Sequence, residues 1–254
     1  MFLYRCEDNL ESIFTAIYRV YEERRDRSDV RLALEDEAWL FSTVIPVVPD
    51  PERCDKVIRT LRRRFGEKDY ESVCLALASP DPEKAQAVYG TVTAGLDGGC
   101  GWGRLFDNLA NDDVNRAFHL AVNARRENDH LRGFTRFSEL ENGILYGEIR
   151  PKNDLIPFLM AHFADRFAGE NFVLRDAGRG LFGVHPAGEE WYLLRGAHLM
   201  WEEPCFSASE EKYQNLFRQF CQSITIDARR NAGLQQNMLP LRFREFMTEF
   251  KAEG

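Results

Sequence analysis

The sequence has few cysteines, and they lack the spacing of a metal site. Six cysteines are scattered over 254 residues, and no two of them form a Cys-x-x-Cys pair. Structural zinc and iron–sulfur sites draw on closely spaced thiolates, because one turn must present two ligands together. The five histidines are equally dispersed. We therefore expect buried, reduced thiols, no metal and no cofactor.

Long apolar segments are missing as well. No window approaches 18 uncharged apolar residues, which excludes a membrane-spanning helix. At the N-terminus, the acidic Glu7 and Asp8 come too early for the apolar core of a signal peptide. We therefore expect a soluble protein that stays in the cytoplasm.

Signatures of common catalytic sites are absent too. The chain has no Gly-x-Ser-x-Gly nucleophile motif and no His-Glu-x-x-His metal motif. The glycine-rich stretch 95–103 has no following Lys-Ser/Thr, so it is not a phosphate-binding P-loop. We expect this stretch to form a flexible turn between two helices.

The charge balance is acidic overall and basic in two places. The net charge is −8, whereas proteins that rely on generic phosphate attraction are basic. Residues 52–68 nevertheless carry seven basic and three acidic side chains, and residues 212–246 carry six and two. On a helix, Arg59, Arg62 and Arg63 share one face, which fits either a solvated surface or a phosphate contact. Any DNA binding must therefore use local basic faces and weaken steeply with salt.

Helical patterns dominate the first 130 residues. A short strand is expected to lead into a helix capped at Asp8, whose apolar residues continue to Tyr21 at helical spacing. Residues 41–49 are apolar and β-branched, and they predict a strand or an extended segment. Further helices are predicted from Pro51 to Phe65, at 69–79, at 82–94 and at 112–128.

The pattern changes at residue 131. Asn142-Gly143 is a strong hairpin signal, and it joins strand-like runs at 134–140 and 144–149. Further along the chain, Ser207 caps a last long helix. The remaining predicted elements are a helix at 153–168 and strands at 172–175, 181–184 and 191–194.

This order of elements predicts the fold class. A hairpin, a helix and a three-strand meander indicate an α+β fold, in which helices pack on one face of an antiparallel sheet. We expect a helix-rich part, residues 1–130, and an α+β part, residues 131–254. The two parts are expected to pack as one globular unit.

Three stretches of the C-terminal half have a distinctive pattern. They are Gly133–Phe137 with Gly143 and Pro151, Ala161–Phe167 with Asp176 and Arg179, and Arg229–Gln235 with Met238, Pro240 and Glu249. Together, over about residues 131–250, they resemble a bacterial family of DNA metabolism or repair proteins that is described as a domain of unknown function. Phe172 stands where a Trp is common in this family and Asn153 where a His is expected, which argues against a catalytic role for either position.

The resemblance carries an expectation about function. Members of this family are typically encoded beside a DNA-repair radical SAM protein, and some are fused to a uracil-DNA glycosylase-type domain. The resemblance therefore implies work on DNA together with a partner protein. The chain ends soon after Glu249, so no fused glycosylase is expected.

Polar residues on the helix predicted after the hairpin are candidate catalytic residues. His162 and Asp165 can form a general acid–base pair, because imidazole titrates near neutral pH and a carboxylate can orient it. Structural anchoring or DNA contact also explains His162 and Arg166, which lie one helical turn apart. In the structural interpretation, His162 forms a hydrogen bond across the seam between helix and sheet. Asp176 and Arg179 flank a tight turn and are expected to brace it.

Arginine and aromatic side chains near the hairpin predict a nucleic-acid contact. Strand alternation places Arg132, Phe134 and Arg136 on one sheet face, and such mixed surfaces suit single-stranded or extruded bases. A half-buried hairpin with aromatic core residues is the alternative. The candidate nucleic-acid-binding residues are Arg132, Arg136, Arg166, Arg229, Arg230, Asn231 and Gln235.

Two functions remain open from the sequence. The first is a DNA metabolism or repair accessory that binds DNA through local basic surfaces and acts with a radical SAM partner. The second is an enzyme of the glycosylase or hydrolase type that acts on nucleobases or DNA ends, with His162 and Asp165 in its site. Exposed, convergent basic residues favour the first function, and a deep pocket around His162 favours the second.

Overall fold

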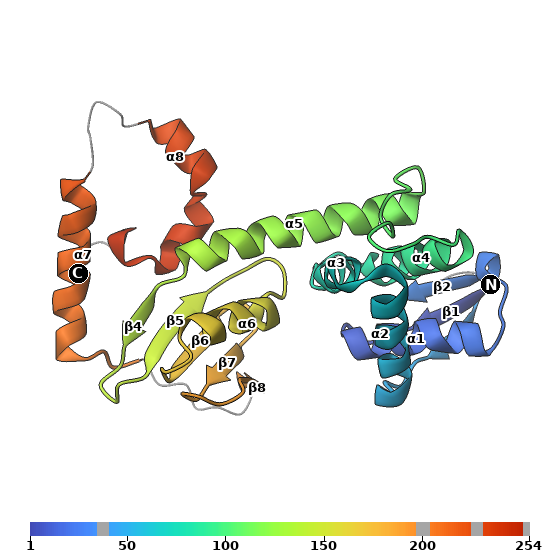
Figure 1. Cartoon of the computed structure of the whole chain (residues 1–254), viewed down its shortest axis with the longest axis horizontal. Helices are drawn as coiled ribbons and strands as arrows, with labels where there is room; N and C mark the ends of the chain where they lie inside the picture. Colours follow the sequence, from blue (N-terminus) through green and yellow to red (C-terminus); the bar gives the residue numbers. More distant parts are fainter. Residues whose placement is uncertain (35–40, 197–203, 225–230, 251–254) are drawn as a thin grey trace. The chain divides into compact units, whose positions relative to one another are not determined.

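The chain divides into two compact units, unit 1 (Met1–Arg126) and unit 2 (Glu127–Gly254). The computed structural model describes residues 1–34, 41–196, 204–224 and 231–250. Figure 1 shows a small sheet surrounded by helices in unit 1 and a larger sheet in unit 2. No helix within the described ranges is long and apolar enough to cross a membrane.

The sheet of unit 1 is short and parallel. Strands β1 (Phe2–Arg5), β2 (Val30–Ala33) and β3 (Thr43–Pro46) lie in the order β2-β1-β3. Both β2 and β3 run parallel to β1. Helix α1 (Leu10–Glu22) and a turn of 3₁₀ helix, η1 (Arg27–Asp29), connect β1 to β2. Such a crossover returns the chain in its starting direction, which is why the pair is parallel.

Helix α1 begins one residue later than the capping pattern predicts. Asn9, not Asp8, is the N-cap, and its Oδ1 accepts a hydrogen bond from Ser12 N at 2.8 Å. Asp8 instead pairs with the buried Lys84, whose Nζ lies 2.5 Å from Asp8 Oδ1. The predicted apolar stripe is correct through Ile17, since Ile13, Phe14 and Ile17 are buried, whereas Tyr21 at its end is 39% exposed.

Three further helices complete the core of unit 1. They are α2 (Pro51–Phe65), α3 (Glu67–Leu77) and α4 (Lys84–Asp97). The glycine-rich stretch begins inside α4, where Gly95 packs against Leu105 so closely that a Cβ would lie 2.4 Å from Leu105 Cδ1. Trp102 then anchors the loop by donating from Nε1 to Arg63 O at 3.2 Å. The stretch is therefore the packed end of α4 followed by a largely exposed turn.

The sheet of unit 2 is mixed rather than antiparallel. Its order is β4-β5-β6-β7-β8, and β5 runs parallel to β6 while the other neighbours are antiparallel. The strands are β4 (Phe137–Glu139), β5 (Leu145–Ile149), β6 (Phe172–Asp176), β7 (Leu181–His185) and β8 (Tyr192–Arg195). The predicted antiparallel sheet is wrong at one pair, because helix α6 (Ile156–Arg166) crosses over between β5 and β6.

Aromatic side chains fill the space between α6 and this sheet. Phe137, Phe163 and Phe172 form edge-to-face contacts at centroid distances of 5.0 and 5.6 Å. Met160 lies over Gly183, where a Cβ would come within 2.3 Å of the Met160 sulfur. A residue with a side chain at position 183 would therefore push α6 off the sheet.

The remaining helices are long or lie near the C-terminal end. They are α5 (Asp112–Phe134), α7 (Ala208–Ser223), α8 (Ala232–Met238) and the 3₁₀ turns η4 (Leu241–Phe246) and η5 (Thr248–Phe250). Ser207 caps α7 as predicted, since Glu210 N donates to Ser207 Oγ at 3.1 Å. Glu127 on α5 is buried and accepts from Lys152 N and Asn153 N at 3.1 and 2.9 Å.

Candidate nucleic-acid interface

Helix α2 separates apolar and basic residues onto opposite faces. Cys54, Val57, Leu61 and Phe65 are buried. The other face carries four cations that we name the α2 basic stripe: Lys56, Arg59, Arg63 and Arg64, all exposed. At 1.5 Å per residue, the stripe is about 12 Å long.

The stripe differs from the other arginines of α2 in its pairing. Arg53 pairs with Glu22 at 2.9 Å, and Arg62 pairs with Glu67 at 3.0 Å. Among the described residues, no carboxylate forms an ion pair with a stripe residue. The positive charge that the sequence assigns to residues 52–68 is thus concentrated on the stripe, where it is available to an external anion.

A hollow with a volume of about 510 Å³ lies beside the stripe, and we name it the α1–α2 hollow. Its apolar lining includes Ile17, Val57, Leu61 and Val92, all of which are buried side chains. Such a volume falls within the roughly 300–1,000 Å³ range of small-ligand pockets. The hollow can therefore hold a flat apolar group.

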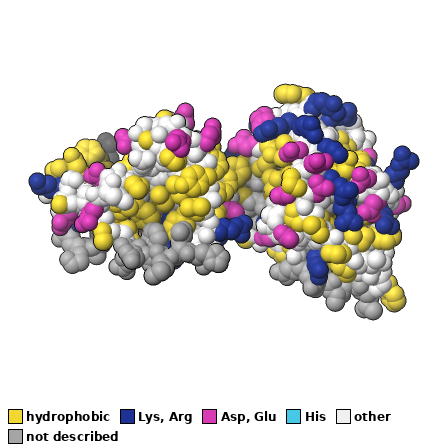
Figure 2. All heavy atoms as spheres, turned by 90° about the horizontal axis from the view of Figure 1, so that it is seen from below, with side chains coloured by type: hydrophobic (Ala, Val, Ile, Leu, Met, Phe, Trp, Pro, Cys, Tyr) yellow, Lys and Arg dark blue, Asp and Glu magenta, His cyan; other side chains and the backbone are white. Residues whose placement is uncertain are grey.

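Two tyrosines of α1 border the hollow together with cations. Arg27 donates to Tyr21 Oη at 2.6 Å and lies 4.8 Å from the centre of that ring. Lys56 donates to Tyr18 Oη at 3.4 Å and lies 5.0 Å from the centre of its ring. Burial raises the pKa of Tyr21, so its phenol stays neutral. The rim of the hollow therefore combines aromatic rings with positive charge, and Figure 2 shows Lys and Arg side chains gathered on unit 1.

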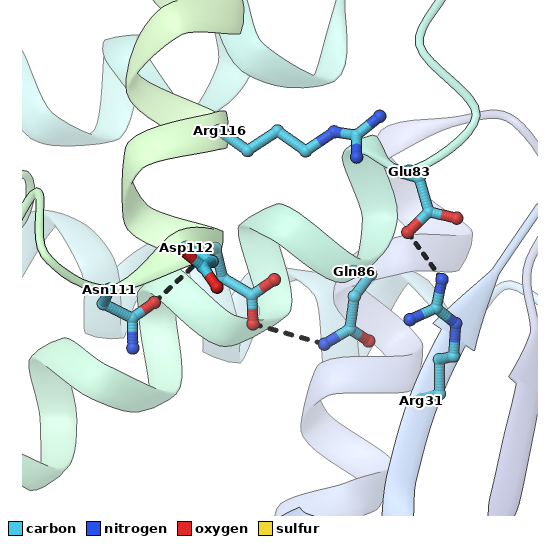
Figure 3. Close-up of a pocket in the computed structure, with 7 residues that line it drawn as sticks. Arg31, Glu83, Gln86, Asn111, Asp112 and Arg116 are labelled. Atoms are coloured by element: carbon cyan, nitrogen blue, oxygen red, sulfur yellow. Dashed lines mark hydrogen bonds and ion pairs between the residues drawn. The ribbon is translucent and has the colours of Figure 1, made fainter.

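A second pocket of unit 1 has the opposite character (Figure 3). It has a volume of about 630 Å³, and its lining includes Glu83, Asp112 and Asp113. Its two cations are already paired, Arg31 with Glu83 at 2.6 Å and Arg116 with Asp81 at 2.8 Å. Burial raises the pKa of Asp113, which accepts from Gln86 at 3.3 Å. Three carboxylates repel phosphate, so this pocket is a poor nucleic-acid site.

In unit 2, the fold brings four of the predicted site residues together: Arg132, His162, Asp165 and Arg166. Burial and the nearby Arg132 and Arg166 guanidinium groups lower the pKa of His162 below its usual value, and the Asp165 carboxylate opposes this shift more weakly. Arg132, Asp165 and Arg166 are exposed, and His162 is half-buried. Within the described part of the chain, no hydrogen bond joins His162 to Asp165, and none joins His162 to the sheet. The group is a small basic cluster around a neutral imidazole, and a catalytic role for His162 and Asp165 stays a prediction.

The predicted sheet face around Arg132 and Arg136 is wrong. Helix α5 continues to Phe134, so Arg132 and Phe134 are helical and Arg136 precedes β4. Arg136 donates to Glu249 Oε1 at 2.7 Å and to Gly133 O at 2.8 Å. These bonds hold the C-terminal turn against the end of α5, and they leave Arg136 a structural cation.

The remaining predicted residues differ in where they lie and in what they contact. Arg229 and Arg230 lie outside the described residues. Asn231 caps α8, with Oδ1 accepting from Leu234 N at 3.0 Å, and Gln235 is exposed on that helix. The turn brace is confirmed, because Arg179 Nη1 donates to Asp176 Oδ2 at 2.9 Å.

Helix α7 presents an apolar stripe outward. The exposed apolar side chains are Tyr213, Leu216, Phe217 and Phe220 on the helix and Ile224 directly after it. Its inner side is polar, since Gln214 donates to Ser138 Oγ at 3.2 Å and Glu210 accepts from Glu139 N at 3.0 Å. The sequence showed the helical spacing of these apolar residues but not the direction in which they face.

The comparisons with known proteins identify a family. The model of a domain of unknown function, DUF4130, matches residues 82–249. The chain belongs to this family. No curated protein and no solved structure matches it significantly. The α2 basic stripe and the tyrosines of the hollow precede the matched residues, so their interpretation depends on geometry alone.

Proposed function

We propose that this protein is an accessory of DNA metabolism or repair that binds DNA and acts with a radical SAM partner protein. The observation that carries the proposal is the α2 basic stripe, whose cations have no acidic partner among the described residues. On a chain with a net charge of −8, the stripe is a local positive surface that attracts anions. A phosphate backbone is a suitable anion, since it presents regularly spaced charges.

The basic cluster of Arg132 and Arg166 supports the same function in unit 2. Both guanidinium groups are exposed and close enough to depress the pKa of His162. A neutral imidazole between two cations can donate or accept a hydrogen bond at a phosphate or a base edge. The cluster is a second candidate contact for a DNA strand. Mutation of Arg132 and Arg166 would measure its contribution to DNA affinity separately from that of the α2 basic stripe.

The apolar stripe of α7 supports the part of the proposal that concerns a protein partner. Contiguous exposed apolar residues mark protein interaction sites more often than free surface. The residues recur at the spacing of one helix face, which the exposed Lys212 borders on one side and Arg136, 5.8 Å from the centre of the Phe217 ring, borders on the other. A mainly apolar face suits a protein better than a nucleic acid, and the family resemblance implies that this protein is the radical SAM partner.

An enzyme acting on nucleobases or DNA ends is the second candidate. The lowered pKa of His162 favours it, because a neutral imidazole is the form that accepts a proton. The test is the purified protein on a panel of damaged DNA substrates, alone and with the partner. Product formation that His162→Gln abolishes, with thermal stability unchanged, would establish the enzyme and displace the accessory role.

The direct test of DNA binding compares two pairs of arginines on one helix. Arg59→Gln/Arg63→Gln removes two stripe cations, and Arg53→Gln/Arg62→Gln removes two paired cations with the same change in charge. Since an exposed ionic contact contributes up to about 1 kcal/mol, the first variant should bind a single-stranded oligonucleotide roughly tenfold more weakly. The second should bind within about threefold of the wild type. Equal losses of affinity in both variants would show that binding depends on total charge and not on the stripe, and they would contradict the proposal.

A further inference from the structure

The α1–α2 hollow and the α2 basic stripe share two residues. Lys56 and Arg64 belong to the stripe and also line the hollow. On a helix they lie about two turns apart in one row, and Thr60, which also lines the hollow, lies between them. A phosphate bound to either cation is therefore placed at the mouth of an apolar cavity.

The interior of the hollow suits a ring rather than a charged group. Ile17, Leu61 and Val92 are almost fully buried, and each contributes only carbon atoms. Tyr18 and Tyr21 are also among the residues that line this cavity. Aromatic side chains beside a positively charged track are the arrangement by which proteins hold successive bases of a single strand.

Arg27 fixes the position of Tyr21 at the edge of the hollow. It donates to Tyr21 Oη and forms an ion pair with Asp97 at the end of α4. Because Arg27 is already paired, it adds little free charge to the hollow. The net attraction for a phosphate therefore comes from Lys56 and Arg64, on the side of the hollow that the stripe occupies.

We propose that the α1–α2 hollow accepts one unpaired base of a DNA strand whose flanking phosphates lie on the α2 basic stripe. This inference rests on the proposed DNA binding, and it names the substrate class as single-stranded or locally unpaired DNA. A base within a duplex is stacked on both faces and cannot enter a cavity without being extruded, which costs a few kcal/mol. The unpaired strand is the occupant that matches both the apolar cavity and the adjacent cations.

The test separates bases from phosphates. Wild-type protein is titrated with a single-stranded oligonucleotide, with an abasic strand of the same length and with the blunt duplex. Stacking of one base corresponds to roughly 5- to 100-fold in affinity. We expect the base-bearing strand to bind more tightly than the abasic strand by a factor in this range and more tightly than the duplex.

Two variants at one position locate the effect. Tyr18→Leu removes the ring and retains an apolar side chain, so it should bind the abasic strand as the wild type does and lose the preference for bases. Tyr18→Phe retains the ring and should retain the preference. Tyr21→Leu repeats the test at the second tyrosine of the hollow. Thermal melting of each variant checks that the fold is intact.

Each other outcome overturns the inference in a different way. Equal wild-type affinity for the base-bearing and abasic strands would refute the base site and leave the DNA-binding function in place. A base preference that survives both Tyr18→Leu and Tyr21→Leu would place the base elsewhere. No binding to any of the three DNAs would remove both proposals. Binding to anionic phospholipid vesicles that Tyr18→Leu abolishes, without a base preference, would assign the hollow to a lipid instead.

Discussion

Helix α2 of unit 1 and the turns around Arg136 and Arg179 of unit 2 use their cations differently. In unit 1, the stripe of α2 leaves Arg59 and Arg63 without carboxylate partners among the described residues. In unit 2, Arg136 is bound to Glu249 and Arg179 to Asp176, at 2.7 and 2.9 Å. The same residue type is thus an exposed surface charge in the first region and part of a structural ion pair in the second. The comparison teaches that local net charge alone does not locate a phosphate site, and pairing must be known as well.

The largest effect is expected from a buried carboxylate of unit 2. Glu127 is 3% exposed and accepts from Lys152 N, Asn153 N and Asn153 Nδ2. Glu127→Ala leaves these donors without an acceptor, and each such loss costs about 1–3 kcal/mol. We expect a total loss of roughly 3 kcal/mol or more in the free energy of unfolding, measured by urea denaturation. A loss below 1 kcal/mol would show that the carboxylate does not stabilise unit 2.

A smaller loss is expected when one internal arginine is removed. Arg136→Ala leaves the Glu249 carboxylate, whose side chain is 13% exposed, without its cation. We expect about 2 kcal/mol of destabilisation, because a largely buried charge without a partner is unfavourable. The affinity of the folded protein for DNA should stay within about twofold of the wild type. A loss of DNA affinity at normal stability would instead show that Arg136 contacts DNA, as the sequence predicted.

The sequence predicted the local elements of both units better than their assembly. The strand before α1, the helix after Pro51 and the hairpin at Asn142-Gly143 are confirmed, because each depends on neighbouring residues alone. Strand β2 (Val30–Ala33) was missed. The parallel pairing of β5 with β6 follows from where α6 packs, which is a tertiary event.

The candidate site shows the same limit. The basic face of α2 was visible as a charge run, but its unpaired part was not, because Glu22 and Glu67 neutralise Arg53 and Arg62 only in the folded chain. The hollow was missed altogether, although Ile17 and Tyr21 were assigned to one stripe. Their cavity forms between α1, α2 and α4, and no single helix contains it.

A moderate effect is expected from the titration of His162, which should make stability depend on pH. Its folded-state pKa is lowered, so the unfolded chain binds a proton more readily. Stability should therefore be unaffected by this group well above its unfolded pKa of about 6.5 and should fall as the pH drops through that value. His162→Gln, which does not titrate, should show a shallower decrease in melting temperature between pH 7.5 and 5.5. Identical pH profiles for the two proteins would contradict the cationic surroundings assigned to His162.

The smallest effect on stability is expected at the apolar stripe of α7. Leu216 and Phe220 are 60% and 56% exposed, so little apolar area returns to water when they are replaced. Leu216→Ser/Phe220→Ser should change the free energy of unfolding by less than about 0.5 kcal/mol per site. The matched control is the fully buried Leu159 of α6, where Leu159→Ala should cost roughly 2–5 kcal/mol. Similar losses at the two places would mean that α7 is covered in the folded chain.

The central claim is that the α2 basic stripe, and not the paired arginines, meets the phosphates of DNA. It is tested most directly by the salt dependence of binding to a single strand, measured for the wild type and for Lys56→Gln/Arg59→Gln/Arg63→Gln. Each lost phosphate contact should reduce the slope of log K against log salt concentration by about 0.7. The account predicts a slope that is shallower by about 2 in the triple variant, with the melting temperature unchanged. An unchanged slope would contradict it.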